Sequence, residues 1–328
     1  MRKTSTALIC SLLFVSCIPQ PKPIGWILLQ TSSNLPPLSH SGFAYDTKSS
    51  EAVVFGGIFK DKWSDETWVW NGNNWRKANT STSPSAREKT AMAYDEARDR
   101  TVLFGGVMDE TVFDDTWEWN SRNWQLMSPT HKPPARCCHA LAYDSMQKKV
   151  VLYGGWNAAT GEFFSDTWMW DGKDWTEMTC CNIPQSAAHT LVNFSDRTRV
   201  VAVPSAEFVN TWQWDGEKWS EITIHPNPSR ADGRSAYDIK NRRIVFFGGI
   251  RNGTFLNDIW VFDGQTWNLL NLPTQPPARY GHILFYDTTR RTVILFGGTG
   301  SAGLLGDTWE LNLPEDLSGL FSKTRPTP

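Results

Sequence analysis

The chain has 328 residues, of which 40% are hydrophobic and 20% charged, with a formal net charge of −2. This balance supports a packed core, excludes a wholly disordered chain and gives no reason to expect nucleic-acid binding. The 18 tryptophans outnumber the 17 phenylalanines and the 7 tyrosines. Tryptophan is not among the common residues of ordinary chains, so the fold must require it repeatedly.

Residues 1–16 have the pattern of a secretory signal peptide. Arg2 and Lys3 form a basic start, and an apolar run follows at residues 7–16. This run is too short to span a bilayer as a stable helix, so we expect it to be removed on export.

The end of this run predicts a lipid anchor. Val15 and Ser16 precede Cys17 in an order that resembles the lipobox of bacterial lipoproteins, in which the cysteine is lipidated and becomes the mature N-terminus. The resemblance implies lipidation of Cys17, and the proline-rich residues 17–24 then read as a stiff tether. We expect a cell-envelope protein, held at the outer membrane or cell surface through this lipid alone. A protein secreted without the lipid is the alternative.

A repeat with a period of about 49 residues organises the rest of the chain. A glycine pair follows a hydrophobic run in five places, at 56–57, 105–106, 154–155, 248–249 and 297–298. A tryptophan marks the third part of each unit: Trp68, Trp117, Trp168, Trp212, Trp260 and Trp309. These markers predict six units.

Each unit predicts four short β-strands, as the third unit illustrates. Residues 139–144 form a short apolar strand, and residues 150–153 form a continuous apolar run typical of a strand buried on both faces. Residues 166–170 form the third strand, and an Asp-Gly pair at 171–172 predicts a hairpin turn into a fourth strand at Trp175. Short strands repeated in this way are typical of β-propeller blades.

A glycine pair after a hydrophobic strand, then a tryptophan and a second tryptophan beyond a turn, resembles the kelch repeat. The resemblance covers residues 25–313 and implies an all-β fold: a six-bladed kelch-type β-propeller with four antiparallel strands per blade, similar to the central domain of galactose oxidase-like proteins. The sixth unit lacks a fourth strand, whereas residues 25–28 match a fourth strand and precede the first unit. We therefore expect the N-terminal strand to complete the last blade and residues 314–328 to form a flexible tail.

The recurring tryptophans are expected to pack between blades, where large flat side chains fill wedge-shaped gaps. Their fixed register favours this role over a carbohydrate-stacking surface. Trp156 has no equivalent in the other units and is therefore a candidate for binding.

Arginine before the first strand and aspartate before the third-strand tryptophan occur together in four units. The pairs are Arg87 with Asp115, Arg136 with Asp166, Arg230 with Asp258 and Arg279 with Asp307. The first and fourth units lack both residues. This shared absence favours an ion pair within each blade over a ring of free guanidinium groups that would bind an anionic ligand.

Three histidines share one register near the expected channel: His139, His189 and His282. Histidine is a common metal ligand, but these three are spread over the third, fourth and sixth units and are not expected to converge on one ion. We expect no metal and no cofactor.

Two cysteine pairs, Cys137-Cys138 and Cys180-Cys181, lie on connections between blades. In an oxidising compartment all four cysteines are candidates for disulfide bonds, which could form either between the two pairs or within each pair. The alternative is a metal or redox site that includes His139, although the spacing is unusual for zinc.

The fourth unit departs most from the repeat, because Pro204-Ser205 replaces the glycine pair and the following loop is short. We expect a low rim here beside the long loop 156–164, and hence a ligand groove. The candidate ligand-binding residues are non-repeating residues of this loop face: Phe59, Lys60, Asp109, Glu110, Trp156, Glu162 and Arg251.

The chain has no nucleophile elbow, P-loop, dinucleotide fingerprint or zinc-protease motif. Two functions remain. The first is a monomeric, non-catalytic binding or scaffold protein that recognises a protein or glycan through the loop face. The second is a carbohydrate-active propeller enzyme, similar to sialic-acid epimerases or the copper oxidases, with histidine and arginine acting near the channel.

Overall fold

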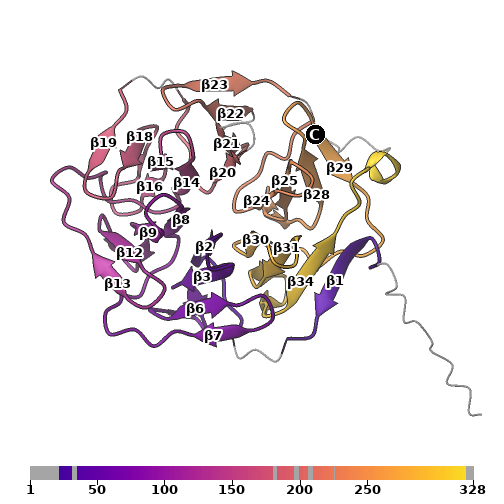
Figure 1. Ribbon diagram of the computed structural model, residues 1–328, viewed down its shortest axis with the longest axis horizontal. Coiled ribbons are helices and arrows are strands. Elements are labelled where there is room, and N and C mark those ends of the chain that lie inside the picture. Colours follow the sequence, from indigo (N-terminus) through magenta and orange to yellow (C-terminus); the bar gives the residue numbers. More distant parts are fainter. Residues whose placement is uncertain are drawn as a thin grey trace, which may run out of the picture.

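A computed structural model describes residues 22–31, 35–179, 183–195, 199–205, 210–224 and 226–322. Six four-stranded antiparallel sheets form a ring around a central channel (Figure 1). The predicted all-β, six-bladed propeller with four antiparallel strands per blade is therefore confirmed. Within the described ranges, no helix has the length and apolar character needed to cross a membrane.

In blades 1 to 5 the strands run in chain order from the channel to the outside. Blade 1 holds β2 (Gly42–Asp46), β3 (Glu51–Phe55), β6 (Thr67–Trp70) and β7 (Trp75–Lys77). Blade 2 holds β8 (Ala91–Asp95), β9 (Arg100–Phe104), β12 (Thr116–Trp119) and β13 (Trp124–Leu126). Blade 3 holds β14 (Ala140–Asp144), β15 (Lys149–Tyr153), β18 (Thr167–Trp170) and β19 (Trp175–Glu177).

The second half of the ring repeats this order. Blade 4 holds β20 (Thr190–Phe194), β21 (Arg199–Val203), β22 (Thr211–Trp214) and β23 (Trp219–Ile222). Blade 5 holds β24 (Arg234–Asp238), β25 (Arg243–Phe247), β28 (Ile259–Phe262) and β29 (Trp267–Leu270). Blade 6 holds β30 (Ile283–Asp287), β31 (Thr292–Phe296), β34 (Thr308–Asn312) and, as its outer strand, β1 (Gly25–Leu29).

The fourth-strand tryptophans join each blade to the one before it. Trp175 of blade 3 packs on Phe104 of blade 2, with ring centroids 5.4 Å apart, and its indole N–H donates to Thr116 Oγ1 at 2.9 Å. The same indole-to-threonine bond joins Trp124 to Thr67, Trp219 to Thr167 and Trp267 to Thr211. These tryptophans are buried, so they are packing residues and not a carbohydrate-stacking surface.

Blade 6 closes the ring by joining the two ends of the chain. β1 pairs with β34 in a five-residue antiparallel register that sets Trp26 opposite Leu311. Trp26 is 2% exposed and packs against Phe247 of blade 5 at 5.1 Å. The N-terminal strand thus completes the last blade, as predicted, and covers the edge that β34 would otherwise expose.

The residues that follow β34 pack against the outside of blade 5. Leu317 is buried, and a short 3₁₀ helix η2 (Ser318–Leu320) brings the Leu320 carbonyl to the N–H of Asn271 at 2.8 Å. Phe321 forms a β-bridge with Leu270. Residues 314–322 of the expected tail therefore continue the edge of blade 5, and residues 323–328 lie outside the described residues.

Replacing Trp26 with alanine should destabilise the ring closure. Loss of a fully buried tryptophan costs about 3–5 kcal/mol, so the melting temperature followed by circular dichroism should fall clearly. The matched control is Leu28→Ala on the same strand, whose side chain is 46% exposed and should cost about 0.5 kcal/mol or less. An unchanged melting temperature for Trp26→Ala would contradict this closure.

Candidate functional site

A closed circle of backbone hydrogen bonds surrounds the channel, and we call its six residues the channel ring. In every blade, a residue ahead of the first strand donates its N–H to the carbonyl of the equivalent residue in the preceding blade. Around the ring, His40 donates to Gly281 (2.8 Å), Lys89 to His40 (2.8 Å), Cys138 to Lys89 (3.0 Å), Ala188 to Cys138 (2.8 Å), Asp232 to Ala188 (3.0 Å) and Gly281 to Asp232 (3.1 Å). All six have positive φ, although only one is glycine. The ring bonds offset the cost of this conformation.

Short hairpins stand around the channel ring in five blades. They are β4 (Ile58–Phe59) with β5 (Lys62–Trp63), β10 (Val107–Met108) with β11 (Thr111–Val112), β16 (Trp156–Asn157) with β17 (Glu162–Phe163), β26 (Ile250–Arg251) with β27 (Thr254–Phe255), and β32 (Thr299–Gly300) with β33 (Gly303–Leu304). Each hairpin bridges to the residue just before a ring residue, as in the Cys137–Trp156 bridge. Hairpins and ring therefore share one face, which we call the hairpin face.

The glycine pairs let these hairpins leave the blades. Gly105 has φ +61°, and a Cβ there would lie 2.5 Å from the Arg136 carbonyl of the next blade. Only glycine fits such a close approach at a positive φ. Among the described residues of blade 4, which has Pro204-Ser205 instead, no such hairpin occurs, and residues 206–209 lie outside the description.

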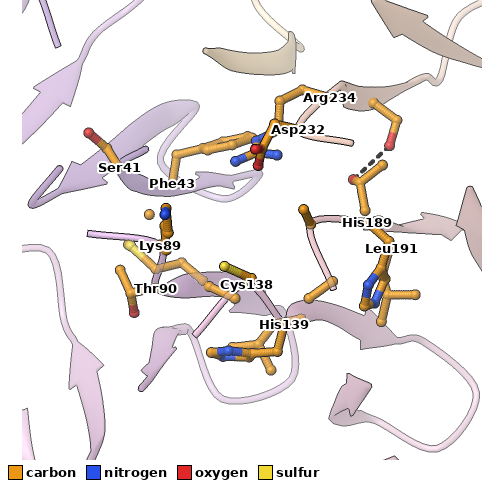
Figure 2. A pocket seen from close by; sticks show the side chains of 18 residues that line it. Ser41, Phe43, Lys89, Thr90, Cys138, His139, His189, Leu191, Asp232 and Arg234 are labelled. Carbon is orange, nitrogen blue, oxygen red and sulfur yellow. Dashed lines mark hydrogen bonds between the residues drawn. The ribbon is translucent and has the colours of Figure 1, made fainter. Parts of the chain in front are cut away.

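A cavity of about 130 Å³ lies in the channel, lined by blades 1 to 5. Figure 2 shows Lys89, Cys138, Asp232 and Arg234 around it, from blades 2, 3 and 5. Arg234 stands where the other blades have small or apolar residues: Gly42, Ala91, Ala140, Thr190 and Ile283. Its Nη1 donates to the Gly233 carbonyl at 3.1 Å. This arginine departs from the repeat and places a cation in the channel.

The cavity lining carries both signs of charge. Burial alone would raise the pKa of Asp232, but His40, Arg234 and Lys89 lower it, so the group is a carboxylate. Burial lowers the pKa of Arg234, partly offset by Asp232 and Cys138. The pKa of Lys89 is raised, because nearby acidic groups outweigh its burial. The channel can thus contact polar ligands that present both donors and acceptors.

The four arginine–aspartate pairs lie inside the blades. Arg87 donates through Nη1 and Nη2 to the two oxygens of Asp115, at 2.5 and 2.9 Å, and Nη1 also reaches the Gly105 carbonyl at 3.1 Å. Asp115 also accepts the indole N–H of Trp117 at 2.8 Å. The same bidentate pairing joins Arg136 to Asp166, Arg230 to Asp258 and Arg279 to Asp307. All four guanidinium groups are buried, so they brace the glycine-pair turn and are not open to a ligand.

The three repeated histidines lie at three different blade interfaces. His139, His189 and His282 pack on Phe104, Tyr153 and Phe247 of the preceding blades, with ring centroids 5.5, 4.8 and 5.6 Å apart. Burial lowers the pKa of each, to about 3 for His189, so all three are neutral. They do not converge, and the described residues contain no group of three or more potential ligands arranged for a metal ion.

The described cysteines are a neighbouring pair of free thiols. Cys137 and Cys138 have sulfurs 3.4 Å apart, without a disulfide between them. Cys17, Cys180 and Cys181 lie outside the described residues, so the lipidation and the other expected disulfides stay predictions.

The seven candidate rim residues lie on four hairpins. Phe59 and Lys60 belong to the first, Asp109 and Glu110 to the second, Trp156 and Glu162 to the third, and Arg251 to the fourth. The structure arranges them around the hairpin face and does not gather them into one cluster.

Two contacts organise parts of this rim. Trp156 is stacked on Phe163, with centroids 6.0 Å apart and an interplanar angle of 27°. The ammonium of Lys60 lies 5.0 Å from the centre of the Phe59 ring. Sequence analysis missed the cavity residues Lys89, Asp232 and Arg234. Comparing the six first strands position by position would have found Arg234.

The architecture defines a kelch-type β-propeller with a cavity at one end of its channel. The family model of the KLHDC2/KLHL20/DRC7 Kelch-repeats domain matches residues 18–202, more than half of the chain. The protein therefore belongs to this kelch-repeat family. Its fold is similar to the solved structure of YjhT, with a TM-score of 0.68 and 14% identity over 90% of this chain and 99% of that one. No curated protein sequence matches.

Replacing Asp115 with asparagine should destabilise the protein by about 3 kcal/mol in urea unfolding, because the buried Arg87 loses its counter-charge. The matched control is Lys48→Met, which removes the exposed ion pair with Asp99 and should cost about 1 kcal/mol or less. Equal stability of Asp115→Asn and the parent chain would mean that the guanidinium is not a structural group.

Proposed function

We propose that the protein is an exported binding or scaffold protein that recognises a protein or glycan through the hairpin face, without catalysis. The observation that carries this proposal is the set of five hairpins that stand around the cavity. The proposed binding groove lies beside the hairpin of blade 3, next to the short loop that the sequence predicts in the fourth unit. Propeller rims built from loops on a rigid scaffold suit recognition of large ligands.

The chemistry of the hairpins supports contact with a macromolecule. Trp63 and Phe163 are large hydrophobic side chains that are 41% and 40% exposed, and both lie on hairpins. Exposed aromatic side chains are enriched in binding interfaces. The stacked Trp156 and Phe163 form an aromatic platform beside the groove, which suits a sugar face or an apolar side chain.

The position of the chain start is compatible with the proposed lipid anchor. β1 is the outer strand of blade 6, and the described chain begins at Lys22 just before it (Figure 1). A lipid on Cys17, joined by a short tether, would attach at the circumference of the ring and leave the channel mouth accessible. The anchor and the envelope location remain part of the proposal.

Replacing Trp156 with alanine should weaken ligand capture at least about tenfold, as loss of an interface anchor worth 1.4 kcal/mol or more would do. The measurement compares partners recovered from envelope extract, and binding to a glycan array, for the parent chain and the variant. Leu126→Ala is the control, because Leu126 is 53% exposed on outer strand β13. Equal capture by Trp156→Ala, with unchanged melting temperature, would overturn the groove hypothesis.

A carbohydrate-active enzyme is the second candidate, favoured by the charged lining of the cavity. Asp232 could exchange a proton and Arg234 could hold an anionic sugar, while the buried histidines His139 and His189, which also line the cavity, are neutral. NMR of sialic-acid anomer exchange separates the two functions. Exchange that is accelerated by the parent chain and lost in Asp232→Asn would replace the binding function with catalysis.

A further inference from the structure

Two adjacent cysteines stand at the channel mouth, in positions that the fold leaves free to vary. Cys138 is the channel-ring residue of blade 3, and Cys137 is the residue before it. The equivalent pairs in the other blades are Ser39-His40, Glu88-Lys89, Ala187-Ala188, Ala231-Asp232 and Tyr280-Gly281. No other blade has a thiol here, so the propeller does not need the doublet for packing.

The backbone holds both cysteines firmly while their sulfurs face each other. Cys137 exchanges two hydrogen bonds with Trp156, of 2.8 and 2.9 Å, and Cys138 bonds to Lys89 and Ala188 within the channel ring. The sulfurs are 3.4 Å apart, and a disulfide bond is about 2.05 Å long.

The two thiols differ in access to solvent. Cys137 is 0% exposed, whereas Cys138 is partly exposed and lines the cavity (Figure 2). A molecule in the channel can thus reach Cys138 and not Cys137. This is the arrangement of an attacking thiol with a resolving thiol behind it.

The two thiols share one hydrogen bond, which lowers the pKa of Cys137 and raises that of Cys138. Burial raises the pKa of both thiols and Asp232 raises that of Cys138, whereas the Lys89 ammonium lowers both. The order of attack therefore rests on the access of Cys138 to the cavity, and Lys89 is the cation that favours a thiolate on the pair. The carboxylate of Glu88 acts in the opposite direction. Thiolates are the reactive form in exchange with disulfides, and a neighbouring cation increases their population.

We propose that Cys137 and Cys138 form a thiol–disulfide exchange site for small disulfides that enter the channel mouth. Cys138, after losing its proton, attacks one sulfur of the incoming disulfide, forming a mixed disulfide and releasing the first thiolate. Cys137, also deprotonated, then attacks the Cys138 sulfur and releases the second thiolate. The two thiolates take up the two protons, so the incoming disulfide is reduced to two thiols and the cysteine pair is oxidised.

The product bond is suited to reversible exchange. Adjacent Cα atoms are about 3.8 Å apart across a trans peptide, whereas disulfides usually join Cα atoms about 4.4–6.8 Å apart. A bond between neighbours is therefore strained and more easily reduced than a structural disulfide. The site would pass between its two states as the surrounding thiol–disulfide balance changes.

The test treats the reduced full chain with oxidised glutathione, blocks remaining thiols and maps tryptic peptides by mass spectrometry. Cleavage after Arg136 and Lys148 puts both cysteines in peptide 137–148, and Cys180 and Cys181 in peptide 174–197. The expected product is peptide 137–148 lighter by two hydrogens and resistant to alkylation until dithiothreitol is added. Recovery of this peptide fully alkylated, or only cross-linked to peptide 174–197, would overturn the proposal.

Single variants test the order of attack. Cys137→Ser should accumulate a stable mixed disulfide of glutathione on Cys138, whereas Cys138→Ser should leave the buried Cys137 unmodified. Modification of Cys138→Ser as fast as Cys137→Ser would contradict the assigned order.

Lys89→Met tests the cation while keeping the backbone bonds of the ring. Exchange should slow roughly threefold to tenfold, and the pH midpoint of the rate should move upward. An unchanged pH profile, with an unchanged melting temperature, would remove Lys89 from the proposal.

Discussion

Each blade can bury its faces only against its neighbours, and the structure makes that contact at three distances from the channel axis. Nearest the axis, the backbone ring joins the blades. Further out, buried histidines fill the space beside the glycine pairs of the preceding blade. At the outside, the indole N–H of the fourth-strand tryptophan donates to a threonine of the preceding blade in four of the six blades, as Trp175 donates to Thr116. Since every blade depends on the next, β1 must return to blade 6 to close the series.

The innermost contact has a consequence for function. Because the channel ring uses only N–H and C=O groups, its side chains are free to differ, and the six positions hold His40, Lys89, Cys138, Ala188, Asp232 and Gly281. The outer contacts use side chains and are therefore repeated. Chemical variety thus concentrates at the channel mouth and on the hairpins, which is where the cavity and the exposed Trp63 and Phe163 are found.

The same division separates two kinds of arginine. Arg87 and its three equivalents are sealed inside their blades, each against an aspartate and a glycine-pair carbonyl. Arg234 faces the cavity with a backbone carbonyl as its hydrogen-bond acceptor. The residue type alone does not distinguish a structural arginine from one that can contact a ligand, but its position in the repeat does. An arginine that recurs in several blades, such as Arg87, forms the same structural ion pair in each of them. Arg234, which occurs in one blade where other blades have glycine or alanine, has no such structural role.

The sequence by itself determined the six blades, their strand order, the closure by residues 25–28 and the pairing of Arg87 with Asp115. All of these follow from a residue spacing that repeats from unit to unit. Only the tertiary structure decided the channel ring, the cavity beside Lys89 and Arg234, and the packing of residues 314–322 on blade 5. Each of these brings together segments from different blades through backbone atoms or single, non-repeated side chains. Such contacts do not produce a repeating pattern in the sequence, so they can be identified only from the closed three-dimensional ring.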